Sequence, residues 1–213
     1  MTTQPIKRPR KLGELATSIV THAKKLPEGG IVSPKEFLHL GTRANVDQAL
    51  SRLARRGELL RIGRGMYTRP VKSRFGVRPP SPQTVTKAIS ERTGETIVPS
   101  AAVAANALGL STQVPMRESF LTSGPSRKIK LGRREVELRH APRWQVREGV
   151  AGAAVRALSS IGERNSEETL EQLWKKLAES EKKQLVGMQS FAPEWLAAAI
   201  GRQNELGKEE AVA

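Results

Sequence analysis

The chain has 213 residues, of which 38% are hydrophobic and 27% charged, with no cysteine and a net charge of +15 at pH 7. This length allows one large domain or two small ones. The absence of cysteine excludes disulfides, cysteine-ligated zinc and thiol catalysis. No run approaches the ~18–20 apolar residues of a membrane span. The basic N-terminus also lacks the apolar segment of a secretory signal, so we expect a cytoplasmic protein that is not in the membrane.

The positive charge is concentrated at the start of the sequence. Residues 1–80 hold 17 Lys and Arg against 5 Asp and Glu, a net charge of +12, whereas residues 81–213 hold 19 against 16, or +3. A sign asymmetry of this kind is typical of a polyanion-binding domain joined to a second domain. A basic, solvated surface is the alternative, and the motifs that follow favour nucleic acid.

Residues 1–11 are basic and contain two prolines, and we expect a flexible arm. Such an arm can follow phosphates or enter a minor groove, or it can be an ordinary chain terminus. Its candidate DNA contacts are Lys7, Arg8 and Arg10. Apolar residues from Leu12 to Leu26 have helical spacing. Ser33 and Pro34 then predict the start of a short helix, PKEFLHL, before a turn at Gly41.

Residues 43–56 predict the recognition helix of a helix-turn-helix. Val46, Ala49, Leu50 and Leu53 follow helical spacing and should face inward. The residues expected to face outward and read base edges are Ala44, Asn45, Gln48, Ser51, Arg52 and Arg55. Arginine can pair with guanine in a bidentate manner, and Gln or Asn with adenine. At the helix ends Arg43, Arg55 and Arg56 would reach phosphates. Asp47 could orient an arginine or accept from a cytosine amine.

The segment after this helix predicts a basic wing. Gly57 should stop the helix, residues 58–62 read as a strand, and Gly63 to Gly65 form a tight turn before the chain returns. The wing residues expected to grip the DNA backbone are Arg61, Arg64 and Arg69. A plain hairpin without a ligand is the alternative interpretation.

The composition then divides the chain. We predict a winged helix-turn-helix domain at residues 12–70, a proline-rich linker at 71–81 and a second domain at 82–213. The second domain should begin with a helix to Thr93 and continue as an α+β unit whose strands, near 95–99, 118–122, 127–131 and 135–139, include a meander. It should end in helices, one beginning at Val150, one capped by Ser166 and one starting at Pro193. The expected fold class is α+β, with the winged helix first.

An enzymatic site is not indicated. His22, His39 and His140 are scattered without metal-ligand spacing, and Asp47 is the only aspartate, which disfavours metal-dependent phosphoryl transfer. Residues 123–126, Ser-Gly-Pro-Ser, could bind a phosphate, although a turn is the better reading. We therefore expect a non-enzyme with no cofactor and no metal. The three tryptophans read as core or interface anchors.

Three segments together resemble the AbiEi-type antitoxins of type IV toxin–antitoxin systems. They are the wing RIGRGMYTRP, then TIVPSAAVAANALGLSTQVP, and then SFLTSGPSRKIKLGRREVELRHAPRW. The resemblance covers roughly residues 10–150, and the ALGL, VP and LTSGPSRKIK pieces are its most distinctive part. The resemblance does not extend to the helices of residues 150–213.

The resemblance implies a bacterial DNA-binding antitoxin that represses its own operon at inverted repeats. It also implies that the second domain counteracts a nucleotidyltransferase-like toxin without forming a stable complex. The chain would act as a monomer or weak dimer, and binding to DNA could be cooperative. A basic hairpin is the candidate antitoxic surface, with Arg127, Lys128, Lys130, Arg133 and Arg134. The alternative is an interaction protein whose second domain binds a partner protein or RNA directly, with DNA binding secondary.

Overall fold

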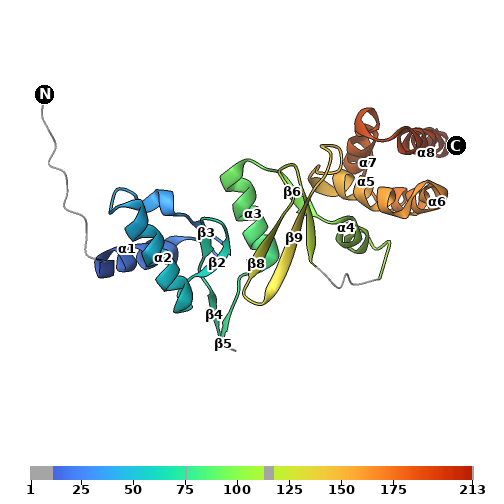
Figure 1. Ribbon diagram of the computed structural model, residues 1–213. Coiled ribbons are helices and arrows are strands. Elements are labelled where there is room, and N and C mark those ends of the chain that lie inside the picture. Colours follow the sequence, from blue (N-terminus) through green and yellow to red (C-terminus); the bar gives the residue numbers. More distant parts are fainter. Residues whose placement is uncertain (1–11, 75, 113–117, 213) are drawn as a thin grey trace, which may run out of the picture. The chain divides into compact units, whose positions relative to one another are not determined.

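The protein is a mixed α+β chain that divides into two compact units. The computed structural model describes residues 12–74, 76–112 and 118–212 (Figure 1). The first unit comprises residues 1–94 with 128–136, and the second comprises 95–127 with 137–213. The α+β class predicted from the sequence is confirmed.

The first unit has the element order of a winged helix. Its elements before residue 70 are α1 (Leu12–Lys25), β1 (Ile31–Val32), the 3₁₀ helix η1 (Pro34–Phe37), α2 (Arg43–Arg55), β2 (Leu60–Gly63) and β3 (Met66–Thr68). The three strands form an antiparallel sheet of order β1-β3-β2, in which Ile31 pairs with Thr68 and Leu60 pairs with the same residue from the other side. Strand β3 of the wing therefore pairs with β1, the strand that precedes η1.

Helix α2 is fixed by its apolar stripe and its caps. Val46, Ala49, Leu50 and Leu53 are all at most 1% exposed and pack with Leu15 and Ile19 of α1, among others. The Thr42 hydroxyl accepts from the backbone N–H of Asn45 at 3.3 Å, which satisfies one of the free donors of the first turn. Gly57 ends the helix with a φ of +74°. These features match the sequence prediction.

Two segments of the first unit differ from the prediction. Residues 34–40 form only the short η1, in which the Ser33 N–H donates to the Glu36 carboxylate at 3.2 Å. The predicted linker contains a two-stranded hairpin, β4 (Val71–Ser73) and β5 (Gly76–Arg78). Its prolines, Pro79 and Pro80, follow β5 and therefore do not interrupt the pairing of the two strands.

Helix α3 (Pro82–Thr93) belongs to the first unit, beyond the boundary expected from composition. Ser81 caps it by accepting from the Thr84 N–H at 3.2 Å, and Gly94 ends it, as the sequence predicts. Val85 and Ile89 are fully buried. The compact unit that carries the winged helix thus includes one further helix.

The second unit opens on β6 (Ile97–Pro99), α4 (Ala101–Ala107) and β7 (Ser119–Thr122). With β8 (Arg127–Leu131) and β9 (Arg134–His140), of which residues 128–136 belong to the first unit, β6 and β7 form a four-stranded sheet of order β6-β7-β9-β8. Strands β7 and β9 are parallel, so the predicted meander is wrong: β9 lies between β7 and β8. The predicted shared face is confirmed, because Ile129, Leu131, Val136 and Leu138 are at most 1% exposed.

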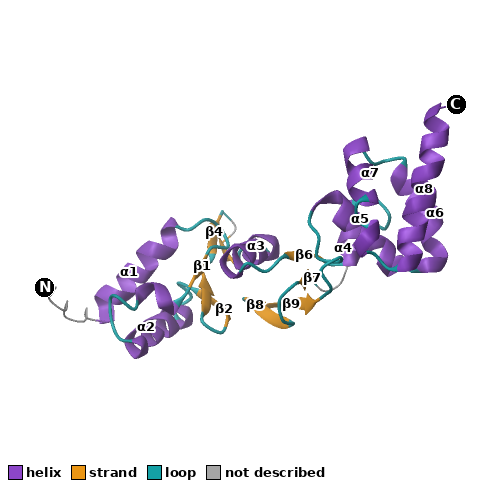
Figure 2. Ribbon diagram, turned by 90° about the horizontal axis from the view of Figure 1, so that it is seen from above, coloured by secondary structure: helices purple, strands orange, loops and turns teal. Residues whose placement is uncertain are grey.

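The C-terminal part is helical, as Figure 2 shows. It contains α5 (Gly149–Ile161), α6 (Glu163–Trp174), α7 (Glu179–Val186), η2 (Gln189–Phe191) and α8 (Glu194–Val212). Ser166 is not a cap: α6 begins three residues earlier, and the Ser166 hydroxyl donates to the Glu163 carbonyl at 2.8 Å. The sequence also missed α7, because the chain turns after Trp174. Within the described residues, no helix is long and apolar enough to cross a membrane.

A single apolar core joins these helices. Leu158 of α5, Leu170 of α6, Leu185 of α7 and Leu196 of α8 are at most 1% exposed and belong to this core. Trp174 lies in it, and Trp144 and Trp195 pack against it, as expected for anchor residues. Burial of several large aliphatic side chains, at roughly 1.5–3 kcal/mol each, is the main term that stabilises this bundle.

Candidate nucleic-acid interface

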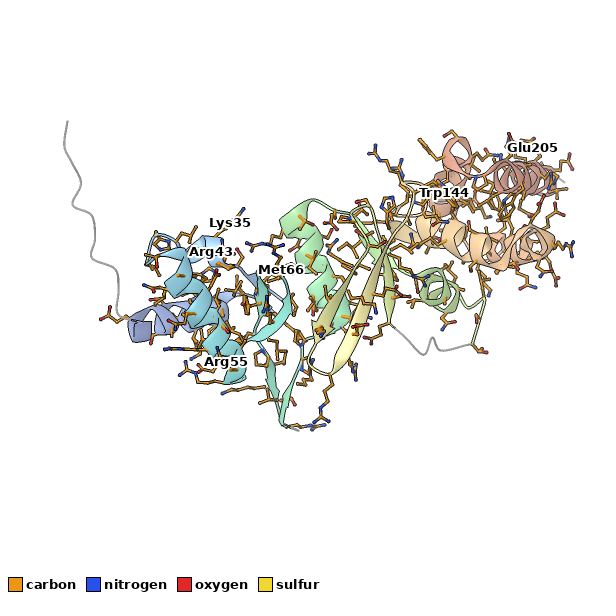
Figure 3. All side chains as sticks on the ribbon, in the orientation of Figure 1. Lys35, Arg43, Arg55, Met66, Trp144 and Glu205 are labelled. Carbon is orange, nitrogen blue, oxygen red and sulfur yellow. The ribbon has the colours of Figure 1, made fainter. Side chains whose placement is uncertain are left out.

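The outer face of α2 is solvent-exposed along its whole length. Figure 3 shows Arg43 and Arg55 at the two ends of the helix. The residues predicted to face outward lie there: Ala44, Gln48, Arg52 and Arg55 are exposed, and Asn45 and Ser51 are half-buried. Because Val46, Ala49, Leu50 and Leu53 hold the opposite face in the core, this exposed face cannot rotate inward.

Intramolecular contacts divide the polar side chains of α2 and its C-cap, Arg56, into two classes. The Arg43 Nε lies 2.8 Å from the Asp47 carboxylate, and the Arg56 Nε lies 3.0 Å from that of Glu58. The Arg55 side chain donates to the Ser51 hydroxyl at 3.4 Å. Asp47 therefore orients an arginine, which was one of its two expected roles.

Gln48 and Arg52 form the other class. Among the described residues, no hydrogen bond or ion pair engages either side chain, although both are exposed. Both side chains can form bidentate hydrogen bonds, and they lie four residues apart on one helix face. A partner outside the chain is the natural acceptor for these donors.

The wing is a short basic hairpin on a rigid base. Gly65 adopts a φ of +65° at its tip, and a register shift between Arg61 and Gly63 bends β2. Arg61, Arg64 and Arg69 are exposed, and in the part of the chain that the structure describes no carboxylate pairs with them. Tyr67 and Thr68 of β3 are buried, which anchors the strand that precedes Arg69.

A polar network supports the segment before α2. The Arg92 guanidinium of α3 donates to the Ser33 hydroxyl at 2.7 Å, the Glu36 carboxylate at 2.6 Å and the Ile31 carbonyl at 3.3 Å. On the other side the His22 Nε2 lies 3.2 Å from a Glu36 oxygen, and its ring packs edge-on against Phe37. Glu36 thus joins α1, η1 and α3, and His22 serves a structural role.

The β4–β5 hairpin carries basic residues that the sequence analysis placed in a linker. Figure 1 shows this hairpin extending from the rest of the first unit, and Lys72, Arg74 and Val77 on it are exposed. Arg78, at the end of β5, pairs with Glu28 at 3.1 Å. Residues 71–75, Val-Lys-Ser-Arg-Phe, do not alternate between polar and apolar, so the residue pattern provides no clear signal for these strands. The predicted arm residues Lys7, Arg8 and Arg10 lie outside the described residues.

The candidate antitoxic residues are not equivalent. Arg127 is half-buried, and its guanidinium lies 2.8 Å from the Glu95 carboxylate. Lys128 pairs with Glu135 at 2.7 Å. Lys130, Arg133 and Arg134 are exposed on the hairpin formed by β8 and β9. Arg127 therefore has a structural contact, the ion pair with Glu95, and it is less exposed than the cations of the hairpin.

The distinctive LTSGPSRKIK segment, residues 121–130, connects β7 to β8 in the four-stranded sheet. Glu95 accepts from the Thr122 hydroxyl at 2.9 Å and from Arg127, and a Cβ on Gly124 would lie 2.2 Å from the Glu95 carboxyl carbon. The Ser126 hydroxyl accepts from the His140 N–H at 2.9 Å at the end of β9. The residue types of this segment thus have structural reasons, independent of any ligand.

The described residues contain no group of three or more His, Asp and Glu side chains that could hold a metal ion. His22 and His140 both have protein partners, since the His140 Nδ1 lies 2.9 Å from the Gly124 carbonyl oxygen. Residues 123–126 form a turn that side-chain hydrogen bonds hold in place. In one of them, the Ser123 hydroxyl accepts from the Thr96 N–H.

Comparison with known proteins gives the family and the fold. The chain belongs to a family of unknown function, DUF6088, which matches residues 18–186. A similar solved structure is the crystal structure of the RV2827C protein from Mycobacterium tuberculosis, with a TM-score of 0.52 and 17% identity. That similarity covers 95% of this chain and 80% of the other, and it supports the fold alone. No curated protein matches the chain.

Proposed function

We propose that this DUF6088 member binds duplex DNA sequence-specifically, with α2 in the major groove and the wing on the flanking backbone. The observation that carries the proposal is the outer face of α2, where Gln48 and Arg52 are exposed and have no protein partner among the described residues. Among the described residues, no carboxylate contacts Arg52. On the exposed helix of a winged helix, this arginine can therefore form hydrogen bonds with the edge of a guanine base.

The division among the arginines assigns their roles. Arg52 and Gln48 would read bases, because their donors have no partner among the residues that the structure describes. Arg61, Arg64 and Arg69 would contact phosphates, which positions the helix without reading sequence. Arg43 and Arg56 keep carboxylate partners at 2.8 and 3.0 Å, so their contribution to phosphate binding would be smaller.

The biological role that we propose is that of an antitoxin. The resemblance of residues 10–150 to AbiEi-type antitoxins supports autorepression of a bacterial toxin–antitoxin operon and neutralisation of a nucleotidyltransferase-like toxin without a stable complex. A palindromic operator would take two copies of the chain, bound as a weak dimer or as cooperating monomers. The protein would act in the cytoplasm, without a cofactor and without catalysis of its own.

A second candidate is an interaction protein whose second domain binds a partner protein or RNA directly. The exposed Lys130, Arg133 and Arg134, which lie in the second domain predicted from the sequence, favour it, because a basic hairpin suits an acidic partner. In this case DNA binding would be secondary.

Selection from a pool of randomised duplexes tests DNA recognition. The intact chain should enrich one inverted repeat. Arg52→Ala should then weaken binding to the selected site by about 5- to 150-fold, since a bidentate base contact contributes ~1–3 kcal/mol. Lys87→Ala, an exposed change on α3, is the matched control and should leave affinity unchanged. Enrichment of no sequence, or an unchanged preference in the Arg52 variant, would refute the proposal.

Growth rescue tests the antitoxic role. Co-expression with the toxin encoded beside this gene should restore growth, and Arg52→Ala should keep rescue while losing repression. A triple alanine variant at Lys130, Arg133 and Arg134 should lose rescue and keep DNA binding. Stable co-purification of the toxin with the chain would favour the second candidate instead.

A further inference from the structure

The second unit contains a cavity that plays no part in the proposed DNA contact. Its volume is about 560 Å³, and α4, β7, β9 and α5 contribute to its walls. The polar residues around it include Ser100, Glu137, Arg139, Gln145, Arg156 and Ser159. Small-molecule sites in proteins usually have ~300–1,000 Å³, so this volume is suitable.

Arg156 is the unusual residue of this cavity. It lies on the buried side of α5 and is 3% exposed. Its Nη1 donates to the carbonyls of Gln145 and Arg147, at 3.0 and 2.6 Å. The Nε is buried without an acceptor, and within the described residues no carboxylate pairs with the guanidinium. Burial lowers the pKa of Arg156 to about 10, so the side chain remains charged at neutral pH.

An uncompensated buried cation is costly, and its free edge has a definite shape. The two backbone carbonyls occupy Nη1, which leaves the edge formed by Nε and Nη2. That edge presents two parallel N–H donors, the geometry that fits a carboxylate or phosphate in a bidentate manner. An oxyanion would fit this edge and would supply a counter-charge.

Ser100 provides a second unoccupied group on the same cavity. It is 8% exposed, and its Oγ has no hydrogen-bond partner. The residue precedes α4, yet its side chain does not cap that helix. Buried hydroxyls almost always have a partner, so this one is available to a ligand.

The charges of the cavity favour an anion. Of its charged residues, Arg139 and Arg156 are positive and Glu137 is negative, a net charge of +1. The Glu137 carboxylate already lies 3.5 Å from the Arg139 Nε. It is therefore directed at a residue other than Arg156.

We propose that this cavity binds a small molecule through an oxyanion, a carboxylate or phosphate, held by the Nε–Nη2 edge of Arg156 and the hydroxyl of Ser100. The remaining volume accommodates the body of the ligand beside Ala101, Ala102 and Leu121. The site does not depend on the winged helix, and it gives the second unit a binding function of its own.

Nitrogen-15 NMR of the full chain tests this site, because a buried Arg Nε–H exchanges slowly enough to observe. Inorganic phosphate and acetate are titrated separately at constant ionic strength, with chloride as the reference anion. The Arg156 Nε–H and the amides of Ala101 and Ala102 should shift and saturate. Saturation by phosphate alone assigns a phosphate ester ligand, and saturation by acetate alone assigns a carboxylate.

Two serine variants keep the test independent of folding. Ser100→Ala should weaken binding about fivefold, the loss expected for one hydrogen bond. Ser166→Ala removes a hydroxyl of similar burial outside the cavity and should bind normally. Absence of saturation for both anions up to about 10 mM, or equal weakening in the two variants, would overturn the proposal and leave Arg156 as a clamp on residues 145–147.

Discussion

Arg92 shows how one side chain extends the winged helix beyond the boundary that composition predicts. Its guanidinium bonds Ser33, Glu36 and the Ile31 carbonyl from α3. Arg92→Met keeps the aliphatic stem and removes these donors, leaving the partly buried Glu36 without its cation. We expect the free energy of unfolding to fall by about 1–3 kcal/mol, measured by chemical denaturation.

Lys87→Met on the exposed side of the same helix is the control for that measurement. It changes charge and side-chain type equally but removes no hydrogen bond that the structure shows. A similar loss of stability in both variants would contradict the role given to the Arg92 contacts, because it would point to net charge instead.

At the residue scale, the sequence predicts well which side of a helix a residue faces, and it predicts poorly which side chains form ion pairs with each other. The spacing of Val46, Leu50 and Leu53 was sufficient to place Arg52 outward, since helical periodicity is local. Which arginine remains unpaired depends on Asp47 and Glu58, whose side-chain directions periodicity does not give. Arg156 had a visible signal, a charged residue in the middle of an alanine-rich apolar helix, and its importance became clear only from its burial.

The packing of α3 against the loop after α1 can be tested through glycine. Gly29 has a φ of +81°, and a Cβ there would lie 2.7 Å from the Thr84 carbonyl carbon; Gly57 has a φ of +74° and open space. Both alanine variants suffer the left-handed backbone strain of ~1–3 kcal/mol. Only Gly29→Ala must also displace α3, so its midpoint of denaturation should be clearly lower than that of Gly57→Ala. Equal midpoints would show that α3 yields without cost.

The order of the strands in the four-stranded sheet could not be predicted from the sequence. Strand positions followed from alternation, yet the place of β9 between β7 and β8 depends on pairs such as Phe120 with Leu138, which are distant in sequence. The hydrogen bond from the His140 N–H to Ser126 supports that arrangement. Likewise Ser166 resembles a helix cap locally, and only the turn after Ile161 reveals that α6 starts earlier. Long-range pairing and tertiary turns are not encoded in a local pattern.

At the scale of the whole molecule, the number of basic residues in the sequence exceeds the number of basic side chains that are available to bind DNA. The 17 Lys and Arg of residues 1–80 include cations that are already paired, such as Arg78 with Glu28. The affinity for DNA should therefore reflect a smaller set of unpaired side chains on α2 and the wing than the sequence total implies. Each phosphate contact releases counterions, so the salt dependence of binding counts them.

The wing should contribute to that salt dependence and the second unit should not. Arg64→Ala should lower the slope of log affinity against log salt by about 1 on any duplex sequence, because it removes one phosphate contact. Arg164→Ala, an exposed arginine of α6, removes the same charge from the second unit and should leave the slope unchanged. Fluorescence anisotropy on a non-specific duplex over a range of salt concentrations measures both. Equal decreases would mean that overall charge, rather than the wing, determines the non-specific affinity.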